Sequence, residues 1–207
     1  MLPIETKPTA LFVEHDSRFI YVPCANLQLE HSLAALAKWE SKWHKPFLKC
    51  LADQTIDKEM LLSYIACMIQ DIHIRPDKKS KFNTELFSDP YKTEEQKQYL
   101  AFAILQDPEI SKKVLEYLND QYTATWFNKD TQKGSTRGET ITAEILYYDM
   151  FKLRIPLECE NWHLNRLLTL IRVFGEKDNP KKMSKNETLA RNHNLNKQRL
   201  AKGKYRG

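Results

Sequence analysis

Histidine and cysteine are the residue types in this chain that most often bind metals or act as nucleophiles, and there are six and four of them. No His-x-x-x-His pair, His-Glu-x-x-His string or Cys-x-x-Cys spacing occurs. His44 and Cys50 lie close together, but Pro46 and Phe47 stand between them. We therefore expect no metal site, free thiols rather than disulfides, and no nucleophile with a matched base.

Phosphate-binding loops and hydrolase motifs are also missing from the sequence. The five glycines form no Gly-x-x-x-x-Gly-Lys-Ser/Thr, Gly-x-Gly-x-x-Gly or Gly-x-Ser-x-Gly pattern. The carboxylate pairs Glu94/Glu95 and Glu158/Glu160 precede apolar helical patterns, where acidic side chains ordinarily complement the helix dipole. The sequence thus predicts a protein that is not an enzyme, has no catalytic residue and uses no cofactor.

Aromatic and basic side chains remain as candidates for binding a partner. Trp39 and Trp43 are four residues apart, which places them on one side of a helix, and Trp162 begins a strongly apolar helical pattern. Packing within the protein is the preferred interpretation of these tryptophans, and partner contact is the alternative. The full predicted contact set is Trp39, Trp43, Trp126, Trp162, Arg166, Arg172, Lys181, Lys182, Lys185, Arg191 and Arg199.

Helices must position most of these side chains. Apolar residues recur with helical spacing over 29–43, 57–69, 93–106, 108–119, 139–153 and 162–174. The segment 139–153 is apolar on nearly every side, which is typical of a central core helix. Residues 9–22 contain two β-prone runs around His15-Asp16-Ser17 and predict a hairpin. We predict a mainly α fold: a helical body with a small N-terminal β-hairpin and an extended basic C-terminal tail.

Charge and composition divide the chain into three parts: 1–28 with the hairpin, the helical body 29–175, and a basic tail 176–207. The tail has ten lysines and arginines against three acidic residues, whereas the rest of the chain has a small net negative charge. A thin apolar stripe in the tail predicts a helix that is only partly formed until it binds something. The polar stretch 129–138, with two glycines, predicts a flexible loop within the body.

Membrane insertion is not expected. No apolar run approaches the roughly eighteen residues that span a bilayer. The N-terminal Met-Leu-Pro-Ile-Glu lacks the basic start and apolar middle of a signal peptide. The basic tail fits three roles: contact with nucleic-acid phosphates, docking on an acidic protein surface, or solubility alone.

Several strings in the chain resemble a protein family encoded among the tail genes of long-tailed bacteriophages, mostly of Gram-positive hosts. Members are described as tail assembly chaperones or tail-region proteins. The strings are LEHSL at 29–33 with KWES at 38–41, KPFL at 45–48, TATWF at 123–127, ITAEI at 141–145, WHLNRLLTLIRV at 162–173, PKKMSK at 180–185 and LARN at 189–192.

The resemblance implies a mainly helical protein that acts in the host cytoplasm and binds the long tape measure protein. It would keep that protein soluble until tail-tube subunits polymerise around it, so the tail tube is a further expected partner. Apart from the resemblance, a second copy of the chain is also left open as a partner. Two alternatives stay open. One is a structural component of the virion, such as a minor tail or neck protein whose extensions order against neighbours. The other is an accessory protein that binds nucleic acid through its basic tail.

Overall fold

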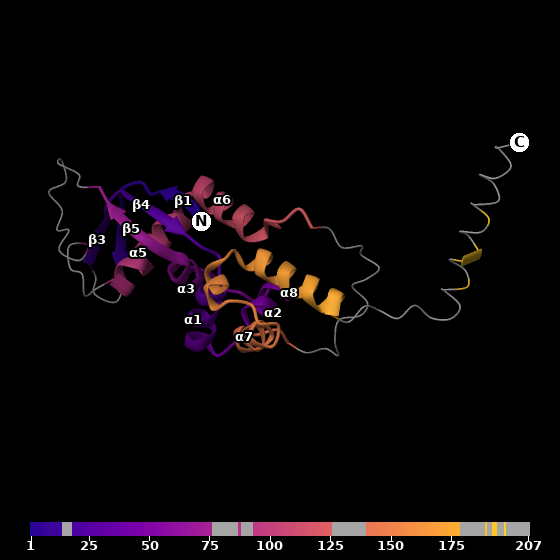
Figure 1. Cartoon of the computed structure of the whole chain (residues 1–207). Helices are drawn as coiled ribbons and strands as arrows, with labels where there is room; N and C mark the ends of the chain where they lie inside the picture. Colours follow the sequence, from indigo (N-terminus) through magenta and orange to yellow (C-terminus); the bar gives the residue numbers. More distant parts are fainter. Residues whose placement is uncertain are drawn as a thin grey trace, which may run out of the picture. The chain divides into compact units, whose positions relative to one another are not determined.

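The computed structural model describes residues 1–13, 18–75, 87, 93–125 and 140–178, with residues 189, 192, 193 and 197 in addition (Figure 1). The chain divides into two compact units, Met1–Ile171 and Arg172–Gly207, and the division falls within the last long helix. Nearly all the described secondary structure belongs to the first unit. The described part of the second unit is chiefly the end of that helix.

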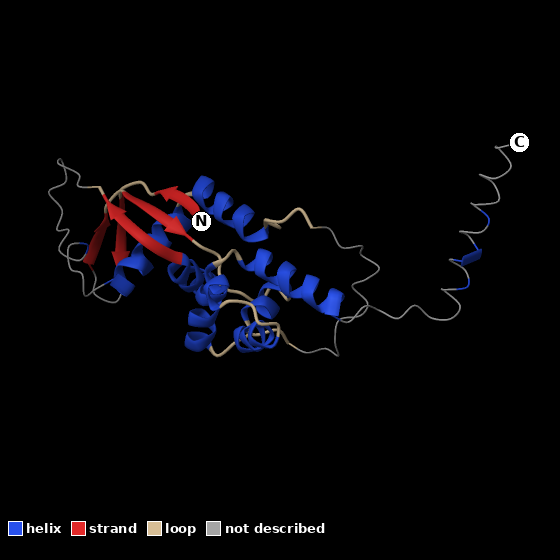
Figure 2. Ribbon diagram, viewed as in Figure 1, coloured by secondary structure: helices blue, strands red, loops and turns tan. Residues whose placement is uncertain are grey.

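The first unit combines helices and strands (Figure 2). The strands are β1 (Leu2–Glu5), β2 (Thr9–Val13), β3 (Arg18–Val22), β4 (Ala25–Leu29) and β5 (Ile69–Ile74). The helices are α1 (Leu33–Trp43), α2 (Phe47–Ala52), α3 (Lys58–Met68), α5 (Thr93–Gln106), α6 (Pro108–Asn119), α7 (Ala143–Lys152), the 3-10 helix η3 (Leu157–Asn161) and α8 (Leu164–Asp178). None of the described helices is both long enough and apolar enough to cross a membrane.

The first four strands form one antiparallel ribbon that proline interrupts. β1 pairs with β4 and β2 pairs with β3 in a single continuous register. That register places Pro8 opposite Pro23, and because proline has no N–H to donate, the ladder breaks there. Thr6 forms the last hydrogen-bonded pair between β1 and β4 before the break. Its N–H donates to the Ala25 carbonyl at 2.9 Å, and its Oγ1 accepts the Ala25 N–H at 3.0 Å.

The break also changes which face of the ribbon is buried. In the β1–β4 half Ile4 and its partner Leu27 are buried, whereas in the β2–β3 half Leu11 and Val22, on the opposite face, are buried. Side chains alternate between the two faces of a strand, so Phe12 lies on the face that Ile4 occupies in the other half, and it is exposed. We call the β2–β3 half, which contacts α5, the β-arm.

Strand β5 adds a third strand to the sheet of β1 and β4, and this makes the predicted fold class wrong. β5 pairs antiparallel with β4, which gives a three-stranded sheet in the order β1-β4-β5 beside the two-stranded β-arm. The predicted hairpin is confirmed within this larger ribbon. The described part of the chain is still mainly helical, but its strands form two small antiparallel sheets rather than a single small hairpin. Most of the predicted basic tail lies outside the described residues.

Two helix boundaries shift for the same reason. The segment predicted as helix from 29 belongs to β4 and a short connection, and α1 begins only after Ser32, whose Oγ accepts the Ala35 N–H. The helix predicted over 57–69 ends at Met68, because Ile69 takes an extended conformation and starts β5 without an intervening loop. In each case pairing between distant strands overrides the local helical pattern.

The core of the first unit contains side chains from α1, α2, α3, α5 and the sheet, and its aromatic part lies between α1, α2 and α3. Trp39, Phe47 and Tyr64 are fully buried there. The Phe47 and Tyr64 rings stack with centroids 3.8 Å apart, and the Trp39 indole N–H donates to the Met60 carbonyl at 2.9 Å. These contacts leave no polar atom of Trp39 unpaired, as a buried indole requires.

Candidate partner-binding surface

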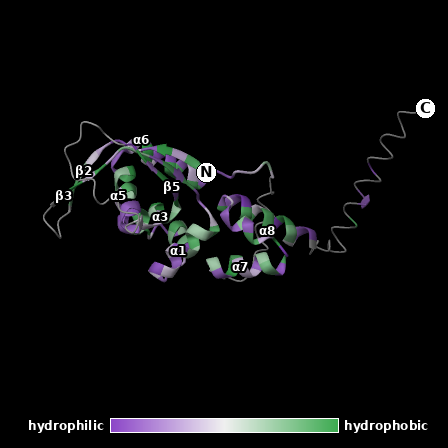
Figure 3. Cartoon of the chain, turned by 60° about the vertical axis from the view of Figure 1, so that its left-hand side comes forward, coloured by the Kyte–Doolittle hydropathy of each residue, from purple (hydrophilic) through white to green (hydrophobic). Residues whose placement is uncertain are grey.

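Helix α7 exposes large aromatic side chains on its outer face. Ala143, Leu146 and Met150 are buried on its inner side, whereas Tyr148 is 62% exposed and Phe151 is 68% exposed. In Figure 3, where hydrophobic residues are green, much of this helix is green. The prediction of a central core helix is therefore wrong, because the second apolar side of α7 faces outward and no described residue buries it. We call Tyr148 and Phe151 the α7 face.

Further apolar side chains flank the α7 face along the chain. Ile141, just before the helix, and Leu157, in η3, are both exposed. The Lys152 ammonium lies 5.9 Å from the centroid of the Tyr148 ring, which is within range of a cation–π contact. Exposed apolar side chains that occur in groups mark interaction sites more often than single ones do. This part of the first unit is therefore the strongest candidate for contact with a partner.

The start of α8 adds a partly exposed apolar stripe. Leu164 and Leu167 are buried, but every side chain from Leu168 to Ile171 is partly exposed. The stripe was predicted from its helical spacing, and the structure leaves its second half incompletely covered by the described residues. An amphipathic helix in this state can still bury more apolar area against a partner.

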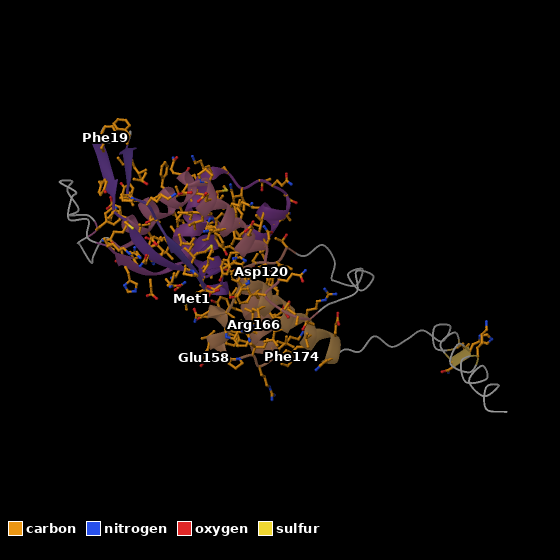
Figure 4. All side chains as sticks on the ribbon, turned by 90° about the horizontal axis from the view of Figure 1, so that it is seen from above. Met1, Phe19, Asp120, Glu158, Arg166 and Phe174 are labelled. Carbon is orange, nitrogen blue, oxygen red and sulfur yellow. The ribbon has the colours of Figure 1, made fainter. Side chains whose placement is uncertain are left out.

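Trp162 and Arg166 are brought together at the start of α8. The Arg166 guanidinium carbon lies 4.1 Å from the centroid of the Trp162 ring. Trp162 is half-buried, whereas Arg166, which is labelled in Figure 4, is exposed. Arg172, in the second unit, forms an ion pair with Glu176 one turn further along, with 3.2 Å between Nε and Oε1. Such an exposed pair contributes only a few tenths of a kcal/mol to helix stability, about 0.3–0.5 kcal/mol.

The other predicted tryptophans behave differently. Trp39 is fully buried, so we leave it out of the proposed contact surface. Trp43 is half-buried, stacks on Trp39 with centroids 6.0 Å apart, and donates its indole N–H to Ser63 at 3.0 Å. Six members of the predicted set lie outside the described residues: Trp126, Lys181, Lys182, Lys185, Arg191 and Arg199.

The β-arm exposes an aromatic pair that sequence reasoning missed. Phe12 and Phe19 lie opposite each other on β2 and β3, with ring centroids 5.0 Å apart, and are 54% and 74% exposed (Figure 4). The alternation of Leu11 with Phe12 indicates two faces, but it does not say which face the body covers. The covered face depends on the change of buried face between the two halves of the ribbon, which meet at Pro8 and Pro23.

A cluster of buried ionisable side chains lies where β4, α3, α6 and α8 meet. The His31 Nδ1 and the Tyr64 hydroxyl are 2.6 Å apart, and the Tyr117 hydroxyl donates to Glu30 at 2.7 Å. The α-amino group of Met1 forms an ion pair with the same carboxylate at 2.8 Å. No sequence pattern predicted this cluster, because its members come from distant parts of the chain.

Burial sets the protonation of the histidines in this cluster. Desolvation, with a smaller contribution from repulsion by His163, lowers the pKa of His31 to about 3. Desolvation also lowers the pKa of His163 below its ordinary value. The Nε2 of His163 lies 3.1 Å from the Tyr117 carbonyl, which can only accept, so Nε2 carries the proton. Its Nδ1 is buried without a hydrogen-bond partner among the described residues.

The cluster is arranged to join elements rather than to hold a substrate. Glu30, His31, Tyr117 and His163 are all less than a tenth exposed, and the hydrogen bonds described for them join side chains and backbone groups of different elements. Asn165 adds hydrogen bonds to backbone carbonyls at the end of α6. Within the described ranges, no group of three or more His, Cys, Asp or Glu side chains is placed to bind a metal ion.

A hollow beside α6 offers little enclosure for a small molecule. Its volume is about 750 Å³, and it is open to solvent. Leu2 and Leu115 line it together with charged and polar side chains of α6 such as Lys112, Lys113 and Glu116. Small-molecule sites are usually enclosed and mostly apolar, so this hollow is a weaker candidate than the α7 face.

Comparison of the chain with protein-family models, with curated proteins and with solved structures gave no match. Function must therefore be inferred from the surfaces described above and from the sequence strings that resemble phage tail proteins.

Proposed function

We propose that this chain is a non-catalytic tail assembly chaperone of a long-tailed bacteriophage. It binds the tape measure protein in the host cytoplasm and keeps it soluble while the tail assembles. The observation that carries the proposal is the α7 face, where Tyr148 and Phe151 are exposed one helical turn apart. The family resemblance supplies the identity of the partner.

The spacing of the α7 face suits a helical partner. Side chains three residues apart lie on one side of a helix and form the anchors that helix-in-groove recognition uses. A tape measure protein, which the resemblance implies is long and helical, presents apolar stripes of matching period. The partly exposed Leu168 and Ile171 of α8 provide additional apolar area in the same unit.

The size of this surface fits reversible binding. Full burial of a Phe side chain contributes about 1.5–3 kcal/mol, and association costs several kcal/mol in lost freedom of motion. Two aromatic anchors with partly buried neighbours therefore give a complex that dissociates readily. A chaperone needs such a complex, because tail-tube subunits must displace it.

Co-expression tests the proposal directly. With the tape measure protein of the same phage, the wild-type chain should move that protein into the soluble fraction, whereas Tyr148→Ala combined with Phe151→Ala should not. Leu115→Ala is the matched control, because Leu115 is an exposed apolar residue on α6. If the tape measure protein stays insoluble with the wild-type chain, or if the double variant works as well, the proposal is wrong.

A structural component of the virion is the second candidate, and the β-arm favours it. An exposed aromatic pair on a two-stranded ribbon, Phe12 with Phe19, is the kind of extension by which neighbouring subunits hold each other. Mass spectrometry of purified particles separates the two functions. A chaperone is absent from mature virions, whereas a structural subunit is present in stoichiometric amount.

A further inference from the structure

One carboxylate holds the first turns of two helices that are distant in sequence. Glu40 of α1 is buried, and its Oε1 accepts the Phe47 N–H at 2.9 Å while its Oε2 accepts the Ala143 N–H at 2.7 Å. Phe47 is the first residue of α2, and Ala143 is the first residue of α7. Both bonds are charge-assisted when the carboxylate is ionised.

No local side-chain cap is formed at either helix start. The N-cap residues are Pro46 for α2 and Thr142 for α7, and neither makes a side-chain capping bond. Threonine is among the residues that cap helices well, so its failure to do so at 142 is informative. A local cap would accept the N–H of the second or third helical residue, whereas Glu40 accepts the N–H of the first residue of each helix. Two helix N-termini, each with a partial positive charge, thus converge on a single carboxylate.

The attachment of α7 to the body depends on few other contacts. Ala143, Leu146 and Met150 provide its buried apolar side, which lies against α1. The Tyr147 hydroxyl donates to Glu160 at 2.7 Å, but Glu160 belongs to η3, in the stretch of chain just after α7. Among the described polar contacts, the Glu40 bond is the one that joins α7 to α1. Elements with few buried contacts open locally more easily than the core does.

We propose that Glu40 is a latch that holds α7 on the body, and that this latch sets how firmly the α7 face is presented to its partner. The second part of this inference rests on the proposed function. Glu40 is a positioning residue, because it contacts the backbone of the binding helix and not the partner. Its substitution should loosen α7 and the start of α2, whereas α3, which lacks any bond to this carboxylate among the described contacts, should remain as it is.

Hydrogen–deuterium exchange of the full chain tests the latch without any partner. Glu40→Gln keeps the shape of the side chain but removes its charge and replaces one acceptor with a donor. Loss of a hydrogen bond to a charged group corresponds to a change of about tenfold to a hundredfold in the local opening equilibrium. Amides of 144–152 should therefore exchange faster by that factor, with amides of 61–68 in α3 unchanged.

A local cap separates a latch from a helix cap. In Glu40→Gln combined with Thr142→Asp, the new carboxylate can cap α7 but does not link it to α1, so exchange of 144–152 should stay fast. A return to the wild-type rate would show that Glu40 acts only as a helix cap. Tyr147→Phe is the control for the bond to η3 and should not reproduce the effect. Equal acceleration in all helices, or normal α7 exchange in Glu40→Gln, would overturn the latch.

Co-expression with the tape measure protein then tests the link to binding. Glu40→Gln should reduce the soluble tape measure protein, and the added Thr142→Asp should not restore it. If α7 loosens as expected but solubility is unchanged, the latch stands and its role in binding is wrong. If the wild-type chain itself gives no soluble tape measure protein, the proposed function fails while the exchange result still decides the latch.

Discussion

Helices α3 and α7 have similar lengths and are both strongly apolar, yet the structure uses them in opposite ways. In α3 the apolar side chains on almost every side are buried, including Tyr64, Ile65 and Met68. In α7 one side is buried and the other exposes Tyr148 and Phe151. An apolar sequence therefore identifies a helix that must be covered, but it does not say whether the same chain provides the cover.

The largest expected effect is a loss of stability on substitution of a buried residue that packs against α3. Phe47→Ala removes a ring that stacks on Tyr64 and contacts Trp39, both fully buried. It should lower the free energy of unfolding by about 3–5 kcal/mol. Urea titration of the purified chain measures this loss. A loss below about 1 kcal/mol would mean that these three rings do not form the core.

The buried histidines should make stability depend on pH. His31 has a folded-state pKa of about 3, against an ordinary value near 6.5, so the unfolded chain binds a proton that the folded chain excludes. Stability is therefore lost progressively as the pH falls from about 6.5 toward 3. For His31 alone the loss should be about 2 kcal/mol between pH 6.5 and pH 5. Part of it should disappear in His31→Gln when unfolding is measured at both pH values, and an unchanged profile would contradict the buried, neutral state of His31.

Substitution on the exposed face of α7 should affect binding strongly and the free energy of unfolding only slightly. Phe151→Ala should change the free energy of unfolding by less than about 0.5 kcal/mol, because the ring is mostly exposed. Binding of the tape measure protein should nonetheless weaken about tenfold or more, as the truncation of an interface anchor does. Thermal unfolding and pull-down of the same variant measure the two effects. A large loss of stability without a loss of binding would place α7 in the core after all.

The β-arm should give the smallest effect. Phe12→Ala removes one partner of a cross-strand aromatic pair, which contributes about 0.5–1.5 kcal/mol. Since both rings are exposed, we expect the lower end of that range by urea titration. A loss of several kcal/mol would mean that the pair supports the fold rather than an external contact.

Local signals allowed much of the helical structure to be predicted. The predicted ranges 93–106 and 108–119 coincide with α5 and α6, because Asp107 and Pro108 end one helix and start the next within two residues. The hairpin was predicted for a similar reason, since its two runs are neighbours in sequence. These elements depend on residues a few positions apart, and such patterns can be found in a single chain.

The three-stranded sheet and the surfaces could not be predicted in the same way. β5 pairs with β4, which is distant in sequence, and its first residue, Ile69, had been predicted as the end of a helix. Glu40 contacts Ala143, a residue that no sequence spacing connects to it. Which side of α7 is covered depends on these distant contacts. The candidate site was therefore found by exposure in the structure, and neither Tyr148 nor Phe151 was among the predicted contact residues.

Photo-crosslinking at the α7 face tests the central claim most directly. Tyr148→p-benzoylphenylalanine, co-expressed with the tape measure protein and irradiated in the cell, should give a covalent adduct with that protein. The same substitution at Leu115 of α6 should give little or none. Equal adducts at both positions, or an adduct at 115 without one at 148, would show that α7 is not the binding surface.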